Sequence, residues 1–190
     1  MTQLEDIIRG EINTAGAISF ARFMELALYH PSHGYYERNL KQTGREGDFY
    51  TSVSVGSLYG EMLGMEFARR LGELWPGNVS LIEAGAHDGQ LACDVLSYLG
   101  EYQKHVFRRV EYVIIEPSVS RAHRQVETLL RFQGKVRWVR SWEEIGEFRG
   151  ICFSNELLDA MPVHVFRWDT GAKNWRECRS PMCSLPRSAN

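Results

Sequence analysis

Two glycines between an apolar run and a helical pattern are the strongest candidate for chemistry in the sequence. The stretch Ser80–Asp94 reads SLIEAGAHDGQLACD, with Gly85 and Gly89 in its turn. A glycine turn that joins a strand to a helix aims free backbone N–H groups and the positive end of the helix dipole at a ligand. The acid Glu83 ends the apolar run beside this turn. We therefore expect a nucleotide-type cofactor site here; a tight strand–helix connection is the simpler alternative.

A second acid and a tryptophan follow the next two apolar runs and suit a nucleoside. Glu116 ends the second run, where a carboxylate can accept hydrogen bonds from both hydroxyls of a ribose. Trp142 follows the third run and could stack on an adenine ring. A solvated strand-end acid and a core tryptophan are the alternatives. The dinucleotide fingerprint G-x-G-x-x-G is not met, because His87 occupies the middle of the turn.

Two acids and an amide follow the fourth apolar run. The sequence FSNELLDAMPVH places Asn155, Glu156 and Asp159 before Pro162. Carboxylates in such a place can neutralise and orient a cationic group or take a proton from a nucleophile. The structural alternative is Asn155 as the N-cap of a short helix. We find no Ser-His-Asp spacing and no cluster of metal ligands, so no metal site is predicted.

Alternating strand and helix patterns position these residues. From Val79 on, short apolar runs alternate with amphipathic helical patterns. Such alternation predicts an α/β fold with a mostly parallel sheet covered by helices on both faces. Ligands of such sheets lie beyond the carboxyl ends of the strands. Because the candidate residues all follow the ends of predicted strands, we expect them to lie close together. The predicted strands are Val79–Ile82, Glu111–Ile115, Lys135–Val139, Gly150–Ser154 and Val163–Trp168. The predicted helices are Gln90–Gly100 and Val119–Phe132, the latter with Val119, Ala122, Val126, Leu129 and Leu130 facing inward.

Helical patterns fill most of the chain before the sheet. Thr2 and Glu5 form a capping box, Ser19 can cap a second helix, and a third helix runs over Leu58–Leu74. Residues 33–57 between them are irregular, and a loop of that length is usually functional. The predicted domains are a helical extension with a cofactor-covering loop (1–78), the sheet (79–170) and an irregular tail (171–190).

The tail leaves the predicted sheet unfinished. Asn174–Glu177 could form half of a hairpin, and no periodicity follows it. If Val163–Trp168 is the fifth strand of the sheet, it forms a long apolar edge, which is an aggregation hazard. We therefore expect the sheet to be incomplete, because the chain is truncated or frame-shifted or because a partner element is missing.

Composition and charge exclude several classes of function. The 190 residues carry a net charge of −2 at pH 7. A nucleic-acid-binding domain is usually strongly basic, so this charge argues against nucleic acid as a ligand. A hydrophobic content of 44% suits a packed core rather than disorder. No apolar run approaches membrane-spanning length, and the N-terminus has no signal-peptide pattern. Four cysteines without a C-x-x-C pair suit a reducing compartment. We expect a cytoplasmic location, with neither nucleic acid nor membrane as partner.

Several motifs carry a family resemblance. They are HPSHGYY (His30–Tyr36), GDFYTS (Gly47–Ser52), YGEMLG (Tyr59–Gly64), the EAGAHDG turn and NELLDAMPV (Asn155–Val163). Their types and order resemble the MidA-like S-adenosylmethionine-dependent methyltransferases, which include a mitochondrial complex I assembly methyltransferase and bacterial relatives. The resemblance covers roughly residues 18 to 177. Family members usually have a glycine at the position of His87, and their chains are considerably longer.

The resemblance implies a fold, a cofactor and a reaction. The fold is the Rossmann-like class I methyltransferase fold with an N-terminal helical extension. The cofactor is S-adenosyl-L-methionine, and the reaction is methylation of arginine on a protein substrate; a homodimer is left open. By this resemblance Glu83, Gly85 and Gly89 would form the cofactor turn and Glu116 would bind the ribose. Asp48, Thr51 and Ser52 would lie over the methionine end, and Asn155, Glu156 and Asp159 would form the acceptor side.

Three other functions are left open by the residues alone. The first is a catalytically inactive relative that acts as an assembly or scaffold protein, favoured by His87 and the short chain. The second is a nicotinamide-dependent oxidoreductase, disfavoured because G-x-G-x-x-G is absent. The third is nucleic-acid methylation, disfavoured by the charge balance and by the lack of an aromatic clamp for a flipped base.

Overall fold

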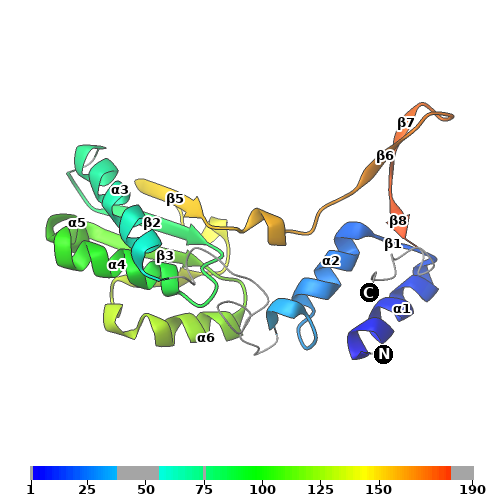
Figure 1. The fold of residues 1–190 in the computed structure, drawn as a ribbon, viewed down its shortest axis with the longest axis horizontal. Helices are drawn as coiled ribbons and strands as arrows, with labels where there is room; N and C mark the ends of the chain where they lie inside the picture. Colours follow the sequence, from blue (N-terminus) through cyan, green and yellow to red (C-terminus); the bar gives the residue numbers. More distant parts are fainter. Residues whose placement is uncertain (1, 38–55, 75, 181–190) are drawn as a thin grey trace. The chain divides into compact units, whose positions relative to one another are not determined.

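Four short strands form the sheet that carries the candidate site (Figure 1). Strand β2 (Val79–Ala84) pairs on one side with β3 (Val110–Ile115) and on the other with β5 (Gly150–Ser154). Strand β4 (Val136–Val139) pairs with β3, which gives the order β4-β3-β2-β5. All of these pairings are parallel. The predicted α/β fold with a mostly parallel sheet is confirmed.

The sheet belongs to one of two compact units. One unit is residues 40–157, and the other combines residues 1–39 with 158–190. Within them, the computed structural model describes residues 2–37, 56–74 and 76–180. Helix α3 (Leu58–Leu74) belongs to the unit of the sheet, whereas the predicted domain boundary at residue 78 would separate it from the sheet.

Apolar side chains at alternate strand positions face opposite sides of the sheet, as the period of two in a strand requires. On one side Leu81 and Tyr112 join the core that α3 and α4 (Gln90–Tyr102) complete. On the other side Ile82 and Val113 pack in a smaller cluster with the partly buried Ile145 and Leu157. The residues of β5 are half-buried or exposed throughout, so this edge strand is the least covered of the four.

Helix α3 approaches α4 closely because glycines line the contact. A Cβ atom at Gly60 would collide with the Cβ atom of Asp94, and one at Gly64 would lie 2.9 Å from Cδ1 of Tyr98. The predicted bounds of α3 are confirmed, and α4 begins where it was predicted. A short helix α5 (Lys104–Arg109) was not predicted, because six residues are too few for a helical period to emerge. None of the described helices is long and apolar enough to cross a membrane.

Helix α6 (Val119–Thr128) turns a different face inward from the one predicted. It ends before the 3-10 turn η3 (Leu130–Phe132). Val119, Val126 and Leu130 are 57%, 42% and 65% exposed, whereas Gln125 and Leu129 are 0% and 1% exposed. The predicted inward face is therefore wrong at those three apolar positions. The physical reason is that the amide of Gln125 has buried hydrogen-bond partners, and satisfying them fixes the rotation of the helix.

Two helices begin the other unit. Helix α1 (Gln3–Ala15) starts at the predicted capping box: the N–H of Glu5 donates to Oγ1 of Thr2 at 3.3 Å, and the N–H of Thr2 donates to Oε2 of Glu5 at 2.9 Å. Ser19 caps α2 (Phe20–Tyr29) as predicted, by accepting from a backbone N–H at 3.1 Å. The apolar contacts between the two helices come from Ile8, Ile12, Ile18 and Leu26.

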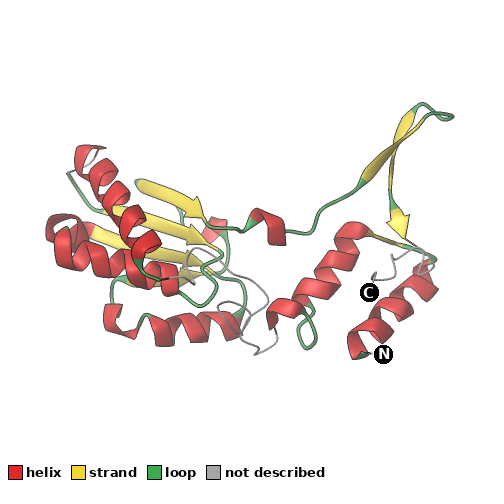
Figure 2. Cartoon of the chain, in the orientation of Figure 1, coloured by secondary structure: helices red, strands yellow, loops and turns green. Residues whose placement is uncertain are grey.

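The predicted fifth strand of the parallel sheet is wrong. Strand β6 (Phe166–Asp169) pairs antiparallel with β7 (Asn174–Glu177) and forms a separate hairpin (Figure 2). The predicted hairpin half at Asn174–Glu177 is confirmed. The hairpin closes locally, because Oδ1 of Asp169 accepts from the N–H groups of Gly171 and Ala172 at 3.0 and 2.9 Å. In the same unit β8 (Arg179–Ser180) pairs with β1 (Ile18–Ser19).

Candidate cofactor site

The glycine turn follows β2 and opens α4, as the sequence predicts. Gly85 and Gly89 have left-handed φ angles of +78° and +86°, which glycine adopts without steric cost. The N–H of Gly89 donates to the carbonyl oxygen of Ala86 at 2.7 Å and tightens the turn. Gly89 caps α4 without a side-chain hydrogen bond. The first turn of α4 therefore presents backbone N–H groups and a positive dipole end that suit a polar or anionic ligand.

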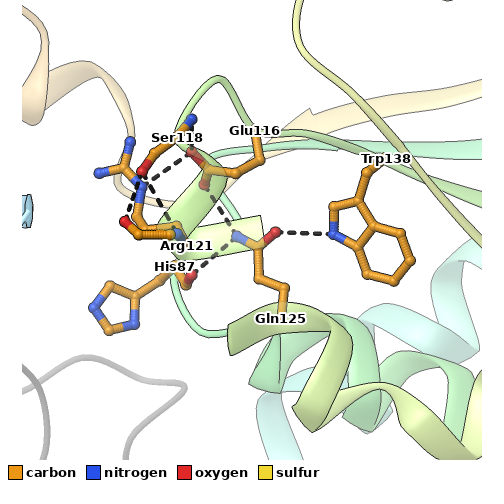
Figure 3. A network of polar contacts seen from close by, with 7 residues as sticks. His87, Glu116, Ser118, Arg121, Gln125 and Trp138 are labelled. Carbon is orange, nitrogen blue, oxygen red and sulfur yellow. Dashed lines mark hydrogen bonds and ion pairs between the residues drawn. The ribbon is translucent and has the colours of Figure 1, made fainter. Parts of the chain in front are cut away.

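His87 stands where a glycine was expected, and it contributes its backbone to the site. Its φ is +49°, a conformation that disfavours a side chain by about 1–2 kcal/mol. The carbonyl oxygen accepts from Nε2 of Gln125 at 2.9 Å. Figure 3 shows the imidazole turned away from Gln125, and the side chain is 40% exposed. The turn thus forms with His87 in place.

The neighbouring Asp88 steadies the start of α4. Its Oδ1 accepts from the N–H of Gln90 at 3.1 Å and lies 3.6 Å from Nδ1 of His87. Partial desolvation of the Asp88 carboxyl favours its neutral form, but the nearby His87 ring and the hydrogen bond from the N–H of Gln90 outweigh it and lower the pKa. Asp88 therefore keeps its negative charge beside the turn.

Glu116 lies at the carboxyl end of β3 and is 5% exposed. Its Oε1 accepts from the N–H of Ser118 at 2.9 Å and from Nε of Arg121 at 3.0 Å. Its Oε2 accepts from Nε2 of Gln125 at 3.0 Å. An ionised carboxylate has about four acceptor positions, so Oε2 retains the capacity to accept from one further hydroxyl.

Gln125 connects the turn to Glu116, as Figure 3 shows. Its Nε2 donates both to Oε2 of Glu116 and to the carbonyl oxygen of His87, and its Oε1 accepts from Nε1 of Trp138 at 3.0 Å. The side chain is completely buried. The structure therefore brings together the turn after β2 and the acid after β3, two features that the sequence predicted separately.

Glu83 lies in the sheet rather than in the turn. Its side chain is 1% exposed, and its Oε2 accepts from the hydroxyl of Tyr112 at 2.6 Å. Burial raises the pKa of Glu83 to about 7, against the opposing effect of the hydrogen bond from Tyr112. Burial also raises the pKa of Tyr112 well above its usual range. At neutral pH the Glu83 carboxyl is therefore close to half protonated, and its role in the cofactor turn stays a prediction.

The predicted acceptor residues lie on both sides of a unit boundary. Asn155 and Glu156 follow β5 in the unit of the sheet, whereas Asp159 belongs to the other unit, in the 3-10 turn η5 (Leu158–Ala160). The hydroxyl of Tyr59 donates to Oδ1 of Asn155 at 3.0 Å. Glu156 is exposed and has a φ of +50°; backbone strain of this kind concentrates at functional sites.

The remaining predicted residues are not brought into this network. Trp142 lies in the 3-10 turn η4 (Trp142–Glu144) and is 51% exposed, so its ring face is accessible for stacking. The tryptophan that joins the network is instead Trp138 on β4. Asp48, Thr51 and Ser52 lie outside the described residues, and their predicted role is untested.

Sequence reasoning missed Gln125, Arg121 and Tyr59. A signal for Gln125 existed, because it is a polar residue on the helical face that it shares with Leu129. Tyr59 opens the YGEMLG motif, but the pattern alone gives it no partner. Arg121 carries no sequence signal, since surface helices commonly contain arginine.

A strand-end acid, a glycine turn and a helix that begins at a glycine, all at the carboxyl edge of a parallel sheet, are typical of proteins that bind a nucleotide-type cofactor. The residues fit such a group, because Oε2 of Glu116 can accept from a sugar hydroxyl. Residues 62–182 match the family of S-adenosyl-L-methionine-dependent methyltransferases, and the chain belongs to this family. The family's cofactor, S-adenosyl-L-methionine, is the one that the motifs implied.

Curated relatives agree with the family. The chain is 29% identical to a Drosophila melanogaster protein named protein arginine methyltransferase NDUFAF7 homolog, mitochondrial, over 90% of this chain and 43% of that one. It is 27% identical to the Mus musculus protein arginine methyltransferase NDUFAF7, mitochondrial, over 88% of this chain and 43% of that one. The chain thus spans less than half the length of these relatives. The predicted cytoplasmic location is contradicted, because the matched relatives are named as mitochondrial proteins.

Solved structures show the same fold. A superfamily member from Burkholderia thailandensis, crystallised with S-adenosyl-homocysteine bound, superimposes with a TM-score of 0.74 at 30% identity. The match covers 96% of this chain and 50% of that one. A native crystal structure of a protein from the same organism gives a TM-score of 0.67 at 30% identity. The Rossmann-like methyltransferase fold is therefore confirmed.

Proposed function

We propose that this chain carries the cofactor half of a methyltransferase that transfers a methyl group from S-adenosyl-L-methionine to arginine on a protein. The observation that carries the proposal is the junction at Gln125, which joins the glycine turn to the strand-end acid Glu116. The S-adenosyl-homocysteine bound to the Burkholderia protein supports the cofactor. The names of the curated relatives support the arginine acceptor.

Each cofactor-binding residue has a role that its environment suits. Glu116 accepts a hydroxyl of the ribose at Oε2, while Ser118 and Arg121 hold Oε1. Gly85 and Gly89 provide the left-handed φ angles that the turn before α4 requires, and at Gly85 a Cβ atom would also lie 2.8 Å from Cδ1 of Leu157. Trp142 offers an exposed ring to the adenine. Asp48, Thr51 and Ser52 are assigned to the methionine end by family resemblance alone.

The acceptor roles fall to Asn155, Glu156 and Asp159. The bound cofactor supplies a methyl group already activated on a sulfonium, so the protein has to orient the acceptor and manage its proton. A carboxylate such as that of Glu156 can pair with a guanidinium and localise its charge away from the attacking nitrogen. The hydroxyl of Tyr59 fixes Oδ1 of Asn155, which leaves the amide N–H groups directed elsewhere.

Substitution Glu156→Gln tests the acceptor assignment. It keeps the shape of the side chain but removes the negative charge, so methyl transfer to an arginine peptide should fall by at least about 100-fold. Binding of S-adenosyl-homocysteine, measured by calorimetry, should change little. Transfer is measured with isotope-labelled cofactor and a panel of arginine peptides, with lysine peptides as the comparison.

A matched control is Glu127→Gln, which removes an exposed carboxylate from α6. It should leave both transfer and binding unchanged. Loss of cofactor binding in Glu156→Gln would contradict the assignment of Glu156 to the acceptor side. Transfer to lysine but not to arginine by the wild-type chain would contradict the proposed substrate.

One observation favours a second function, that of a catalytically inactive assembly protein. His87 occupies a glycine position of the turn, and a side chain there can crowd the cofactor. In the structure the imidazole points away from Gln125, and the turn keeps its hydrogen bond to Gln125 with His87 in place, which weakens the case. Thermal denaturation with added S-adenosyl-L-methionine separates the two functions, because an inactive relative without cofactor binding would show no shift in Tm.

A further inference from the structure

We propose that Gln125 is the positioning residue of the cofactor site, because it fixes which oxygen of Glu116 is presented to the ribose. The inference rests on the proposed function and extends it to a residue outside the turn and the strand ends. It identifies a specificity element for the sugar hydroxyls. Gln125 does not touch the cofactor itself and acts through Glu116.

The amide of Gln125 has a single orientation that satisfies its surroundings. Nε1 of Trp138 can only donate, so the atom facing it has to be the amide oxygen. The carbonyl oxygen of His87 and the carboxylate of Glu116 can only accept, so the atom facing them has to be the amide nitrogen. All three hydrogen bonds are lost if the amide is turned over.

This fixed amide distinguishes the two oxygens of Glu116. Oε1 accepts from the N–H of Ser118 and from Nε of Arg121, which fills its two lone pairs. Oε2 accepts from Nε2 of Gln125 and keeps one lone pair. Gln125 thereby holds Oε2, the oxygen with acceptor capacity, in one place, and a fixed acceptor favours a hydroxyl at one position of the sugar ring.

The same amide holds the left-handed turn. Its second N–H donates to the carbonyl oxygen of His87, the non-glycine residue with a φ of +49°. One side chain therefore binds both the turn after β2 and the acid after β3. A side chain that served only to fill space would be apolar here, because a fully buried amide costs free energy unless each of its groups is hydrogen-bonded.

The test compares ligands that differ by one hydroxyl. The dissociation constants of S-adenosyl-homocysteine and of its 2′-deoxy and 3′-deoxy analogues are measured by calorimetry for wild-type protein and for Gln125→Met. Methionine has a similar length but neither donates as an amide nor accepts strongly. Removing the hydroxyl that Glu116 accepts should weaken wild-type binding by about tenfold or more. We call the dissociation constant of that deoxy analogue divided by the dissociation constant of S-adenosyl-homocysteine the hydroxyl ratio. In Gln125→Met the hydroxyl ratio should fall to about threefold or less.

Two further variants separate positioning from folding. Val106→Ala shortens a completely buried side chain of α5, so it destabilises the same core and should leave the hydroxyl ratio unchanged. Gln125→Glu retains the acceptor for Trp138 but turns a carboxylate toward Glu116. Its hydroxyl ratio should therefore fall as it does in Gln125→Met. Tm values and circular dichroism verify that each variant is folded.

The possible outcomes differ in what they overturn. Equal weakening of all three ligands in Gln125→Met, with the wild-type ratio kept, would overturn the inference and leave a structural role. A wild-type ratio near one would also overturn it, because Glu116 would then not discriminate hydroxyls. Absence of binding by folded wild-type protein would overturn the proposed function, and this inference with it.

Discussion

At the scale of single residues, the buried acid Glu83 has the clearest physical consequence. Its carboxyl and the hydroxyl of Tyr112 share a hydrogen bond inside the sheet, and burial raises the pKa of Glu83 to about 7. An unfolded chain loses this proton near the ordinary value of 4.5. Between these two values the folded state holds a proton that the unfolded state has lost, so stability falls as the pH rises through this window.

Substitution Glu83→Gln should remove that dependence. Glutamine keeps an acceptor for Tyr112 without an ionisable proton. At pH 8 the variant should be more stable than the wild type by on the order of 3 kcal/mol, and the difference should vanish near pH 4. The free energy of unfolding is measured by urea denaturation at both pH values.

Glu111→Gln serves as the control, because Glu111 is an exposed residue of β3 paired with Arg137 at 3.1 Å. Such a pair contributes about 0–1 kcal/mol, so this variant should change little at either pH. A stability difference for Glu83→Gln that is the same at pH 4 and pH 8 would contradict the assigned pKa.

The sequence predicted the candidate site residues that can be recognised by their type and missed those that can be recognised only by their partners. Gly85, Gly89 and Glu116 were predicted because a glycine turn and a strand-end acid are recognisable without coordinates. Gln125 was missed because its function consists of three partners that the fold brings together from separate segments. For the same reason the hydrogen bond between Glu83 and Tyr112, which come from different strands, was not predicted.

At the scale of secondary-structure elements, helix α6 shows where a periodic pattern misleads. Of the five apolar residues predicted to face inward, the structure buries Leu129 but exposes Val119, Val126 and Leu130, and it buries the polar Gln125 instead. The pattern of apolar positions contains no information about the three buried hydrogen bonds of Gln125, which stabilise the observed orientation although Leu130 is exposed. The strands of the sheet were predicted closely because short apolar runs indicate buried strands. The pairing of β6 was predicted wrongly because such a run does not indicate which strand it pairs with.

Two identical substitutions at neighbouring positions test the observed burial where α6 ends and η3 begins. Leu129→Ala should cost about 2–5 kcal/mol, because it opens a cavity in the core. Leu130→Ala should change the free energy of unfolding by no more than about 0.5 kcal/mol, because its side chain is 65% exposed. Chemical denaturation of both variants is the measurement. Equal losses at the two positions would restore the predicted inward face and contradict the structure.

At the scale of the whole molecule, the chain divides the predicted cofactor-binding elements from the rest of the fold. The four-stranded sheet, the turn and Glu116 lie in one unit, and the hairpin and the first two helices lie in the other. The chain spans about half the length of the solved structure and less than half of the curated relatives. Cofactor binding is therefore the proposed property that can be measured most directly on this chain.

The decisive measurement is a calorimetric titration of the chain with S-adenosyl-homocysteine, repeated with Glu116→Ala and with Glu111→Ala. We expect saturable binding by the wild type, equal binding by the exposed-site control Glu111→Ala, and at least about tenfold weaker binding by Glu116→Ala. Absence of binding by the folded wild-type chain, or equal affinity in Glu116→Ala, would contradict the assignment of this site to S-adenosyl-L-methionine.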